Sequence, residues 1–268
     1  MESRTTVIDQ SAVAASPVDA IGASLIVVGL GIQWRAQTTL AAERAIRSAD
    51  SVFFAVVDPA AALWIRTLNP RARSFSYPHD GRPRYRIYEA MVDSLLEELR
   101  LGKRVCGVFY GSPSVLARPA HLAITKARSE GLRARMLPGV SSLDCLFADL
   151  GIDPGDHGLS FHEASLFLDQ RRKIDTRAHL VLCQVAMIGN PGPYDPARVD
   201  MQRRGVSRLS RYLRSAYPED HDVAMYRASS DVHHRFRVER APLGALGSLD
   251  VEAVSTLYVP PLTTEPCH

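Results

Sequence analysis

The stretch Arg104–Val115 constrains the fold more than any other, because an apolar run ends there abruptly at a Gly-Ser-Pro turn. Val105, Val108 and Phe109 are β-branched or aromatic and favour a strand, and Gly111 opens the turn. In open α/β sheets, ligands bind beyond the carboxyl ends of strands, where small residues let a backbone approach a cofactor. The run therefore predicts a buried strand that delivers a ligand loop, with an ordinary strand-to-helix turn as the alternative.

Composition excludes several classes of protein. The chain has 268 residues, 46% hydrophobic and 23% charged, enough for one large domain or two medium ones. A net charge of +3 with scattered basic residues does not predict a nucleic-acid surface. Residues 1–20 lack a secretory signal, and no apolar run approaches the roughly 20 residues of a membrane span. We expect a cytoplasmic protein without a membrane partner, whose cysteines are reduced thiols: Cys106, Cys145, Cys183 and Cys267.

A second apolar stretch, Ser24–Gly31, ends in a Gly-x-Gly turn and precedes a helical pattern over 38–48. This order is compatible with dinucleotide binding, since the next strand, 52–57, is followed by Asp58 at a plausible place for a ribose contact. The third glycine of that fingerprint is missing, and the bulky Gln33–Arg35 stands where a pyrophosphate needs room. A nicotinamide site and a turn that serves only chain geometry both remain open.

An amphipathic helix expected over Arg84–Leu99 places a cation beside a phenol. Apolar side chains recur there at helical spacing, and Arg84 and Tyr88, four residues apart, share a face at the helix start. A surface loop over 74–83, which contains Tyr77, precedes this helix. The alternative makes Tyr88 a core residue and Arg84 a solvated helix end. The other elements expected in this half are helices over 59–68 and 120–130, a strand over 133–137 and a helix from Ser141–Ser142 onward.

The turn-rich segment 151–158 is the predicted domain boundary. Candidate strands alternate with helices before it, which predicts a mainly parallel sheet with helices on both faces in an N-terminal α/β lobe over 23–150. The remainder, 151–262, is expected to be a mixed α/β lobe with longer, partly antiparallel strands. Its strands are expected at 178–187, 222–226, 235–239 and 255–260, around one helix over 196–217. We expect a flexible arm over 1–22 and a polar tail over 263–268.

Three motifs in a fixed order carry a resemblance to a known family. They are Val28-Gly29-Leu30-Gly31, Tyr110-Gly111-Ser112-Pro113 and Pro138-Gly139-Val140-Ser141-Ser142. This order resembles the tetrapyrrole (corrin/porphyrin) methylase superfamily, and within it the chain is most similar to borosin peptide backbone N-methyltransferases. The likeness runs over residues 24–261 and includes Leu68-Asn69-Pro70, Arg84-x-x-x-Tyr88-Glu89-x-Met91, Glu163-Ala164-Ser165 and Ser255-Thr256-Leu257-x-Val259-Pro260-Pro261.

The resemblance implies a two-lobed homodimer that binds S-adenosylmethionine between its α/β lobes. It assigns the catalytic roles to Tyr77, Arg84, Tyr88 and Tyr110. The cofactor-binding residues that it implies are Gly29, Gly31, Tyr110, Gly111, Ser112, Ser114, Val115, Ser141, Ser142, Gln184, Tyr226 and Thr256. No metal site is expected, since the adjacent His233 and His234 point apart.

Amide chemistry explains why tyrosines and an arginine suit this reaction. An amide nitrogen is a poor nucleophile, because its lone pair is delocalised into the carbonyl. Methyl transfer therefore needs partial deprotonation, with negative charge developing on nitrogen and oxygen. A phenolate could take the proton if Arg84 lowered a tyrosine pKa from its usual ~10, while phenol or guanidinium donors stabilise the oxygen.

Two departures from the family pattern refine the expectation. The usual loop is Tyr-Gly-His-Pro-Gly-Val, whereas this chain has Ser112 and Ser114 at the variable points. Fused members carry their substrate at the C-terminus, whereas this chain ends soon after its last expected strand, so a separate precursor peptide is the expected partner. The sequence thus predicts an S-adenosylmethionine-dependent methyltransferase of peptide backbone amides. A methyltransferase of a tetrapyrrole or other small molecule, and a catalytically silent binding homologue, are the alternatives.

Overall fold

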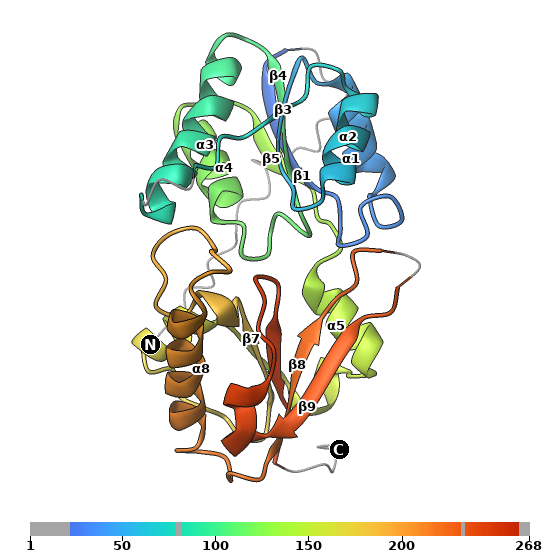
Figure 1. The fold of residues 1–268 in the computed structure, drawn as a ribbon. Coiled ribbons are helices and arrows are strands. Elements are labelled where there is room, and N and C mark those ends of the chain that lie inside the picture. The colour runs from blue at the N-terminus through green and yellow to red at the C-terminus, as the bar shows by residue number, and fades with distance from the viewer. Residues whose placement is uncertain (1–21, 79–81, 232–233, 263–268) are drawn as a thin grey trace, which may run out of the picture.

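A computed structural model describes residues 22–78, 82–231 and 234–262 of the chain. These residues form two α/β lobes, one above the other in Figure 1, each built around its own five-stranded sheet. The expected polar tail over 263–268 and, apart from Gly22, the expected arm over 1–22 lie outside the described residues. The two-lobed α/β architecture agrees with the sequence prediction.

The first sheet has the strand order β3-β2-β4-β1-β5, and every pairing in it is parallel. The central position of β4 explains its uninterrupted apolar sequence, since a strand covered on both faces has no polar side to show. This confirms the predicted buried strand and parallel sheet. In the order of the sheet, the strands are Arg73–Ser74, Ser51–Ala55, Arg104–Phe109, Ser24–Gly29 and Ala134–Met136.

Helices cover both faces of this sheet, as Figure 1 shows. Successive residues of β1 point to opposite faces, so Val27 packs in the core with α3 and α4, and Val28 packs in the core with α1 and α2. Caps fix where two of these helices begin: Thr39 accepts from the Ala42 N–H, and Asp58 accepts from the Ala60 N–H. The four helices are α1 (Leu40–Ser48), α2 (Pro59–Leu68), α3 (Arg84–Arg100) and α4 (Arg118–Ser129).

The second sheet has the order β6-β7-β10-β8-β9. β6 and β7 pair in parallel, and the other three pairings are antiparallel, which agrees with the expected mixed lobe. The core on one face contains α7 (Ala164–Asp169), α8 (Val199–Leu213) and the 3₁₀ turn η3 (Leu243–Ser248). The strands, in sheet order, are Leu159–Glu163, His179–Cys183, Thr256–Val259, Asp222–Arg227 and Arg237–Pro242.

Two details of this lobe differ from the sequence prediction. The strand expected over 178–187 ends at Cys183, because Gln184 is left-handed (φ 57°) and starts the 3₁₀ turn η2 (Val185–Met187). Strand β6 was not predicted, since its side chains are half-buried and partly polar. The strands of this sheet span four to six residues, and those of the first sheet span two to six, so the longest strands of the two sheets are equally long.

Helix α5 (Ser142–Leu150) covers the other face of the second sheet, and the short α6 (Pro154–His157) follows it. Leu146 is fully buried in one core with Val181 of β7, Ala224 of β8 and Tyr258 of β10. In Figure 1, α5 lies beside the lower sheet. A helix that precedes the expected boundary at residue 151 thus packs with the lobe that follows it, and the segment just before it links the two lobes.

Candidate active site

The glycines of the first two motifs bring the ends of β1 and β4 into backbone contact. Gly31 and Gly111 form an antiparallel bridge, with N–O distances of 3.2 and 3.0 Å. Both are left-handed, with φ of 75° and 69°, a conformation that glycine adopts at no steric cost. A Cβ atom on Gly29 would lie 2.0 Å from the carbonyl oxygen of Gly111. These glycines therefore serve chain geometry, by letting two loops meet.

The Pro-Gly-Val-Ser-Ser motif lies at the same end of the first sheet, where it contacts the loop that follows β4. The Gly139 N–H donates to the Ser112 hydroxyl at 3.4 Å, and that hydroxyl lies 2.9 Å from the hydroxyl of Ser114. Ser141 caps α5, since its hydroxyl accepts from the Asp144 N–H while the Asp144 carboxylate accepts from the Ser141 N–H. The serines at 112 and 114, where the chain departs from the family pattern, thus tie the second motif to the third.

A cavity of about 230 Å³ opens at this edge, with residues of both lobes around it. Its walls combine hydroxyl and amide groups with small apolar side chains, which is typical of a small-molecule site. The predicted cofactor-binding residues that line it are Tyr110, Gly111, Ser112, Val115, Ser141, Ser142, Gln184 and Thr256.

A second cavity, of about 110 Å³, lies beside the first and is mostly apolar. Gly31 lines this second cavity. Tyr110 borders both, which places its side chain at their junction, together with Ile32, Ala228 and Val254.

Gly29, Ser114 and Tyr226, also predicted to bind the cofactor, line neither cavity. Tyr226 is fully buried, and its hydroxyl donates to Asp149 of α5 at 2.5 Å. Burial raises the pKa of Tyr226 far above its usual value, and the neighbouring carboxylate raises it further. Its hydrogen bond joins α5 to β8 beneath the site.

The dinucleotide interpretation depended on Asp58, whose carboxylate is already engaged. One oxygen accepts from the Trp34 indole N–H at 2.9 Å, and the other accepts from the Ala60 N–H at 2.7 Å. Asp58 thus caps α2 and anchors a tryptophan.

Three of the predicted catalytic residues lie together at the start of α3. Tyr77 is hydrogen-bonded to Tyr88 and lies within electrostatic range of Arg84. The Arg84 guanidinium lies 3.4 Å from the side-chain oxygen of Gln184 and 3.4 Å from the carbonyl oxygen of Asn190, both in the second lobe. The Arg84 backbone N–H donates to the Pro191 carbonyl at 2.9 Å, which fixes the first turn of α3.

Gln184 connects this cluster with the first cavity, because it lines that cavity and also contacts Arg84. Tyr77, Arg84 and Tyr88 themselves line neither cavity, whereas the fourth predicted catalytic residue, Tyr110, lines both. The structure therefore places a tyrosine–arginine cluster one side chain away from a small-molecule cavity.

Burial determines the protonation of two of these tyrosines. It raises the pKa of Tyr77 to about 12, with a smaller contribution from Tyr88, and the opposing effect of Arg84 does not outweigh it. Burial also raises the pKa of Tyr110 to about 12. Arg84 therefore does not bring the pKa of Tyr77 below its usual value, and the hydroxyls of Tyr77 and Tyr110 keep their protons at neutral pH.

Several residues that line the first cavity were not predicted. Most are small and apolar, and they contribute backbone and shape rather than a recognisable chemical group. The one local signal is conformational: Leu116 is left-handed, with φ of 54°, which a sequence pattern does not reveal. The unpredicted residues are Ile32, Leu116, Ala117, Cys183, Ala228, Ala253 and Val254.

The family model described as Tetrapyrrole (Corrin/Porphyrin) Methylases matches residues 24–246, which is most of the chain. The chain belongs to the tetrapyrrole methylase family. Among solved structures, this tetrapyrrole methylase is similar to a uroporphyrin-III-C-methyltransferase from Thermus thermophilus, with a TM-score of 0.62, 19% identity and coverage of 89% of this chain and 92% of the other. That likeness confirms the two-lobed fold.

Curated relatives of this tetrapyrrole methylase combine two functions in their names. The chain is 40% identical over 247 residues to a methyltransferase/ribosomally synthesized cyclic peptide dendrothelin A precursor of Dendrothele bispora, and 39% identical over 243 residues to the corresponding omphalotin A precursor of Omphalotus olearius. Each alignment covers 89% of this chain and 58% of the relative. The chain thus spans a little under three fifths of the length of these relatives.

The described residues contain neither a candidate metal site nor a candidate membrane span. The structure describes no group of three or more His, Cys, Asp and Glu side chains, within the ranges given above, that could hold a metal ion. No helix in the described part of the tetrapyrrole methylase is long and apolar enough to cross a bilayer.

Proposed function

We propose that the chain is an S-adenosylmethionine-dependent methyltransferase of peptide backbone amides. The observation that carries the proposal is the position of Gln184, which lines the first cavity and accepts a hydrogen bond from Arg84 of the tyrosine cluster. A methyl donor in that cavity and an amide beside the cluster would then be neighbours. The names of the curated relatives, methyltransferase and cyclic peptide precursor, support the same activity.

The residues around the first cavity fit this cofactor. Ser112, Ser141 and Thr256 offer hydroxyl groups, and Gln184 offers an amide, so polar groups of a nucleoside and an amino acid can be satisfied. Ile32 and Val254, with their neighbours, supply apolar walls for a flat ring. When bound, S-adenosylmethionine supplies an activated methyl group on a sulfonium.

The protein side chains are proposed to stabilise the substrate amide as its resonance is lost. The amide oxygen gains negative charge as the nitrogen becomes nucleophilic. The hydroxyls of Tyr77 and Tyr110 keep their protons, since their pKa values are about 12, so both are suited to donate to that oxygen. The Arg84 guanidinium, which cannot lose its charge, stabilises negative charge in the same cluster. Tyr88, in its phenolate form, would accept the proton that leaves the amide nitrogen.

The substrate is proposed to be a peptide offered as a separate chain, and the enzyme a homodimer. The curated relatives support a peptide, since their names join the enzyme to a precursor. Size-exclusion chromatography with light scattering tests the dimer. A single mass near that of the 29.5 kDa chain would contradict it.

Calorimetry and mass spectrometry test the activity together. The purified chain should bind S-adenosylhomocysteine and not NADH. With S-adenosylmethionine and synthetic peptides rich in aliphatic residues, it should add the mass of whole methylene units to the peptide backbone. Methylation of uroporphyrinogen, with none of the peptides, would refute peptide specificity in favour of a tetrapyrrole substrate. Cofactor binding without transfer to either substrate would favour a catalytically silent homologue.

A further inference from the structure

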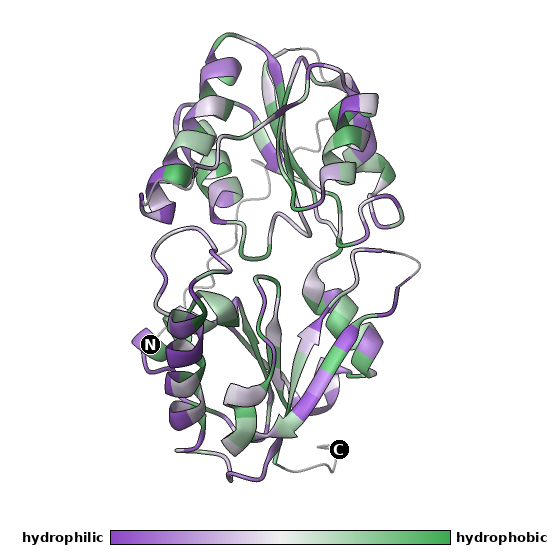
Figure 2. Ribbon diagram, in the orientation of Figure 1, coloured by the Kyte–Doolittle hydropathy of each residue, from purple (hydrophilic) through white to green (hydrophobic). Residues whose placement is uncertain are grey.

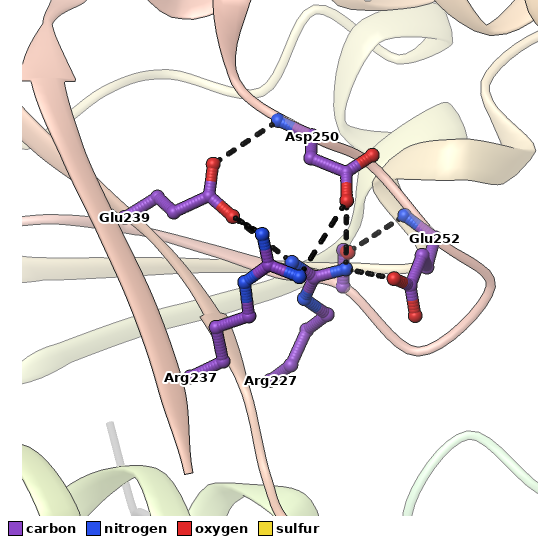
Figure 3. A network of polar contacts seen from close by, with 6 residues as sticks. Arg227, Arg237, Glu239, Asp250 and Glu252 are labelled. Carbon is purple, nitrogen blue, oxygen red and sulfur yellow. Dashed lines mark hydrogen bonds and ion pairs between the residues drawn. The ribbon is translucent and has the colours of Figure 1, made fainter.

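Arg227 is a buried arginine at the end of β8, surrounded by carboxylates (Figure 3). It is 6% exposed. Its guanidinium lies 3.0 Å from Glu239 and 3.2 Å from Asp250, and it also hydrogen-bonds Glu252. The side chains of Asp250 and Glu252 are about half exposed. One buried cation thus holds three acidic side chains together.

The register of the second sheet explains why so many acids gather there. Arg227 and Arg237 stand directly opposite each other in the antiparallel pair β8–β9, where like charges destabilise a sheet. The Glu239 carboxylate lies 3.0 Å from a guanidinium nitrogen of each arginine and offsets that repulsion. A buried arginine with its ion pairs is generally no more stabilising than apolar residues would be. Stability alone therefore gives no reason to keep an arginine at position 227.

The residues beside this network form one wall of the proposed cofactor cavity. Ala228 follows Arg227 directly, and Ala253 and Val254 follow Glu252. Ser255, fully buried, fastens the same segment, since the Glu252 N–H donates to its hydroxyl at 2.8 Å and its own N–H donates to the Glu252 carbonyl at 3.0 Å. Two of the three carboxylates that contact Arg227, those of Asp250 and Glu252, thus lie just before the residues that line the cavity.

We propose that Arg227 is a positioning residue that holds segment 250–254 against the cofactor. The inference rests on the proposed function, since it takes the first cavity to be the cofactor site. Without the arginine, Asp250 and Glu252 lose their common partner and repel each other. Both are exposed enough to turn toward water, so the segment can move while the sheet stays folded. The cavity wall formed by Ala253 and Val254 would move with it.

The test compares three variants by calorimetry with S-adenosylhomocysteine as the probe. Arg227→Met keeps an unbranched side chain in the buried position and removes the charge. Arg227→Lys keeps the charge, but its single ammonium lacks the planar fork that reaches three carboxylates. Arg237→Gln is the matched control, since it removes a charge from the same network at an exposed guanidinium that, among the described residues, forms ion pairs with Glu239 and Asp250 but not with Glu252. A thermal midpoint is recorded for each variant.

We expect the dissociation constant to rise at least tenfold for Arg227→Met and by less for Arg227→Lys, with Arg237→Gln unchanged. In turnover assays, the KM for S-adenosylmethionine should rise while kcat at saturation stays within about twofold. The variant loosens a wall of the cavity that binds the cofactor, but it leaves the reacting groups in place. Replacing Glu252 by Gln in the Arg227→Met background should recover part of the affinity, since it removes one of the repelling charges.

The outcomes separate this inference from the proposed function. A wild-type chain that does not bind S-adenosylhomocysteine would refute both. Wild-type binding together with unchanged affinity in folded Arg227→Lys and Arg227→Met would refute the positioning role alone. An equal loss in Arg237→Gln would also refute it, because the effect would then come from the charge of the network and not from the arginine behind the wall. If Arg227→Met does not fold, Arg227→Lys decides by the same criteria.

Discussion

Replacing Gly29 by alanine should disrupt the meeting of the first two motifs. The new Cβ atom would lie 2.0 Å from the Gly111 carbonyl oxygen and 2.7 Å from Cδ of Pro113. Cβ atoms essentially never come within 3.0 Å of a heavy atom outside their own and the adjacent residues, so the Gly111 loop must retreat by about 1 Å or more. Neither neighbour is the flexible end of a long side chain, so the strain cannot be relieved by a rotamer change.

The size of the effect follows from this geometry. Overpacking of a well-packed interior costs typically about 1–3 kcal/mol. For a domain of this size class, each kcal/mol lowers the thermal midpoint by about 2–4 °C. The loop that moves carries Tyr110 and Ser112, which line the first cavity. A displacement of about 1 Å at such a position can lower turnover by about 10²-fold.

Gly107→Ala is the matched control, since Gly107 lies in β4 of the same sheet. Its Cβ atom would meet its nearest neighbours at 3.5 Å, an ordinary contact, and alanine in a strand interior is favoured over glycine by roughly 0.5–1 kcal/mol. Differential scanning fluorimetry and calorimetry with S-adenosylhomocysteine measure both variants. Equal thermal midpoints and equal affinities for Gly29→Ala and Gly107→Ala would refute the argument.

Three further predictions concern catalysis, pH and a buried amide. Tyr88→Phe should lower turnover by roughly 10²- to 10⁴-fold with little change in cofactor affinity, and Arg84→Lys should also impair the reaction because it loses the planar fork; wild-type rates in both would remove this pair from the mechanism. Lys103 and other partners lower the pKa of Glu98 from 4.5 to about 2, so its contribution to stability is complete above pH 4.5 and disappears as the pH falls toward 2. The difference in urea midpoint between wild type and Glu98→Gln should therefore shrink from pH 7 to pH 3, and a constant difference would contradict this. Asn69→Ala should destabilise the chain by about 1–3 kcal/mol, measured by urea unfolding, because the buried Asn69 amide donates to two carbonyls at the end of α1 at 2.8 and 2.9 Å; an unchanged midpoint would show that water replaces it.

The first sheet could be predicted because the local sequence of its main strands is sufficient to recognise them. The segments that became β1, β2 and β4 are apolar runs that end in glycine, proline or a capping residue, and a parallel sheet buried on both faces requires such runs. The helix α3 has apolar side chains at helical spacing over its whole length, and its observed start at Arg84 agrees with the expected one. Pattern and tertiary structure point the same way in this lobe.

The second sheet was harder because its partners are distant and its patterns are mixed. Strand β6 has the sequence Leu-Ser-Phe-His-Glu, and its side chains are half-buried or exposed. Its own sequence does not favour a strand, so its strand conformation depends on its pairing with β7. Helix α5 follows the first sheet in the chain but packs on the second. Amphipathic periodicity shows that a helix has a buried face, but not which sheet will bury it.

The residues of the candidate site also fall into two groups, those that the sequence predicts and those that it does not. Residues with distinctive chemistry or with glycine spacing, such as Tyr110, Gly111 and Ser112, follow from the motifs and line the first cavity. Ala253 and Val254 line it too, yet small apolar residues in a loop resemble any other loop. We infer that the ion pairs of Arg227 with Asp250 and Glu252 hold these residues in position. Such contacts join residues far apart in the sequence, so no local pattern predicts them.

Gln184 shows why a prediction from local sequence fails at the candidate site. The apolar run that continues through Val185–Met187 predicts an unbroken strand, but Gln184 adopts a left-handed conformation instead. For a residue with a side chain, that conformation costs of order 1–3 kcal/mol and persists only where the surroundings enforce it. The break ends β7 at the cavity and leaves the Gln184 amide between that cavity and Arg84. Strained residues of this kind cluster at functional sites, so the conformation that defeats the strand prediction is itself an independent argument for placing the site here.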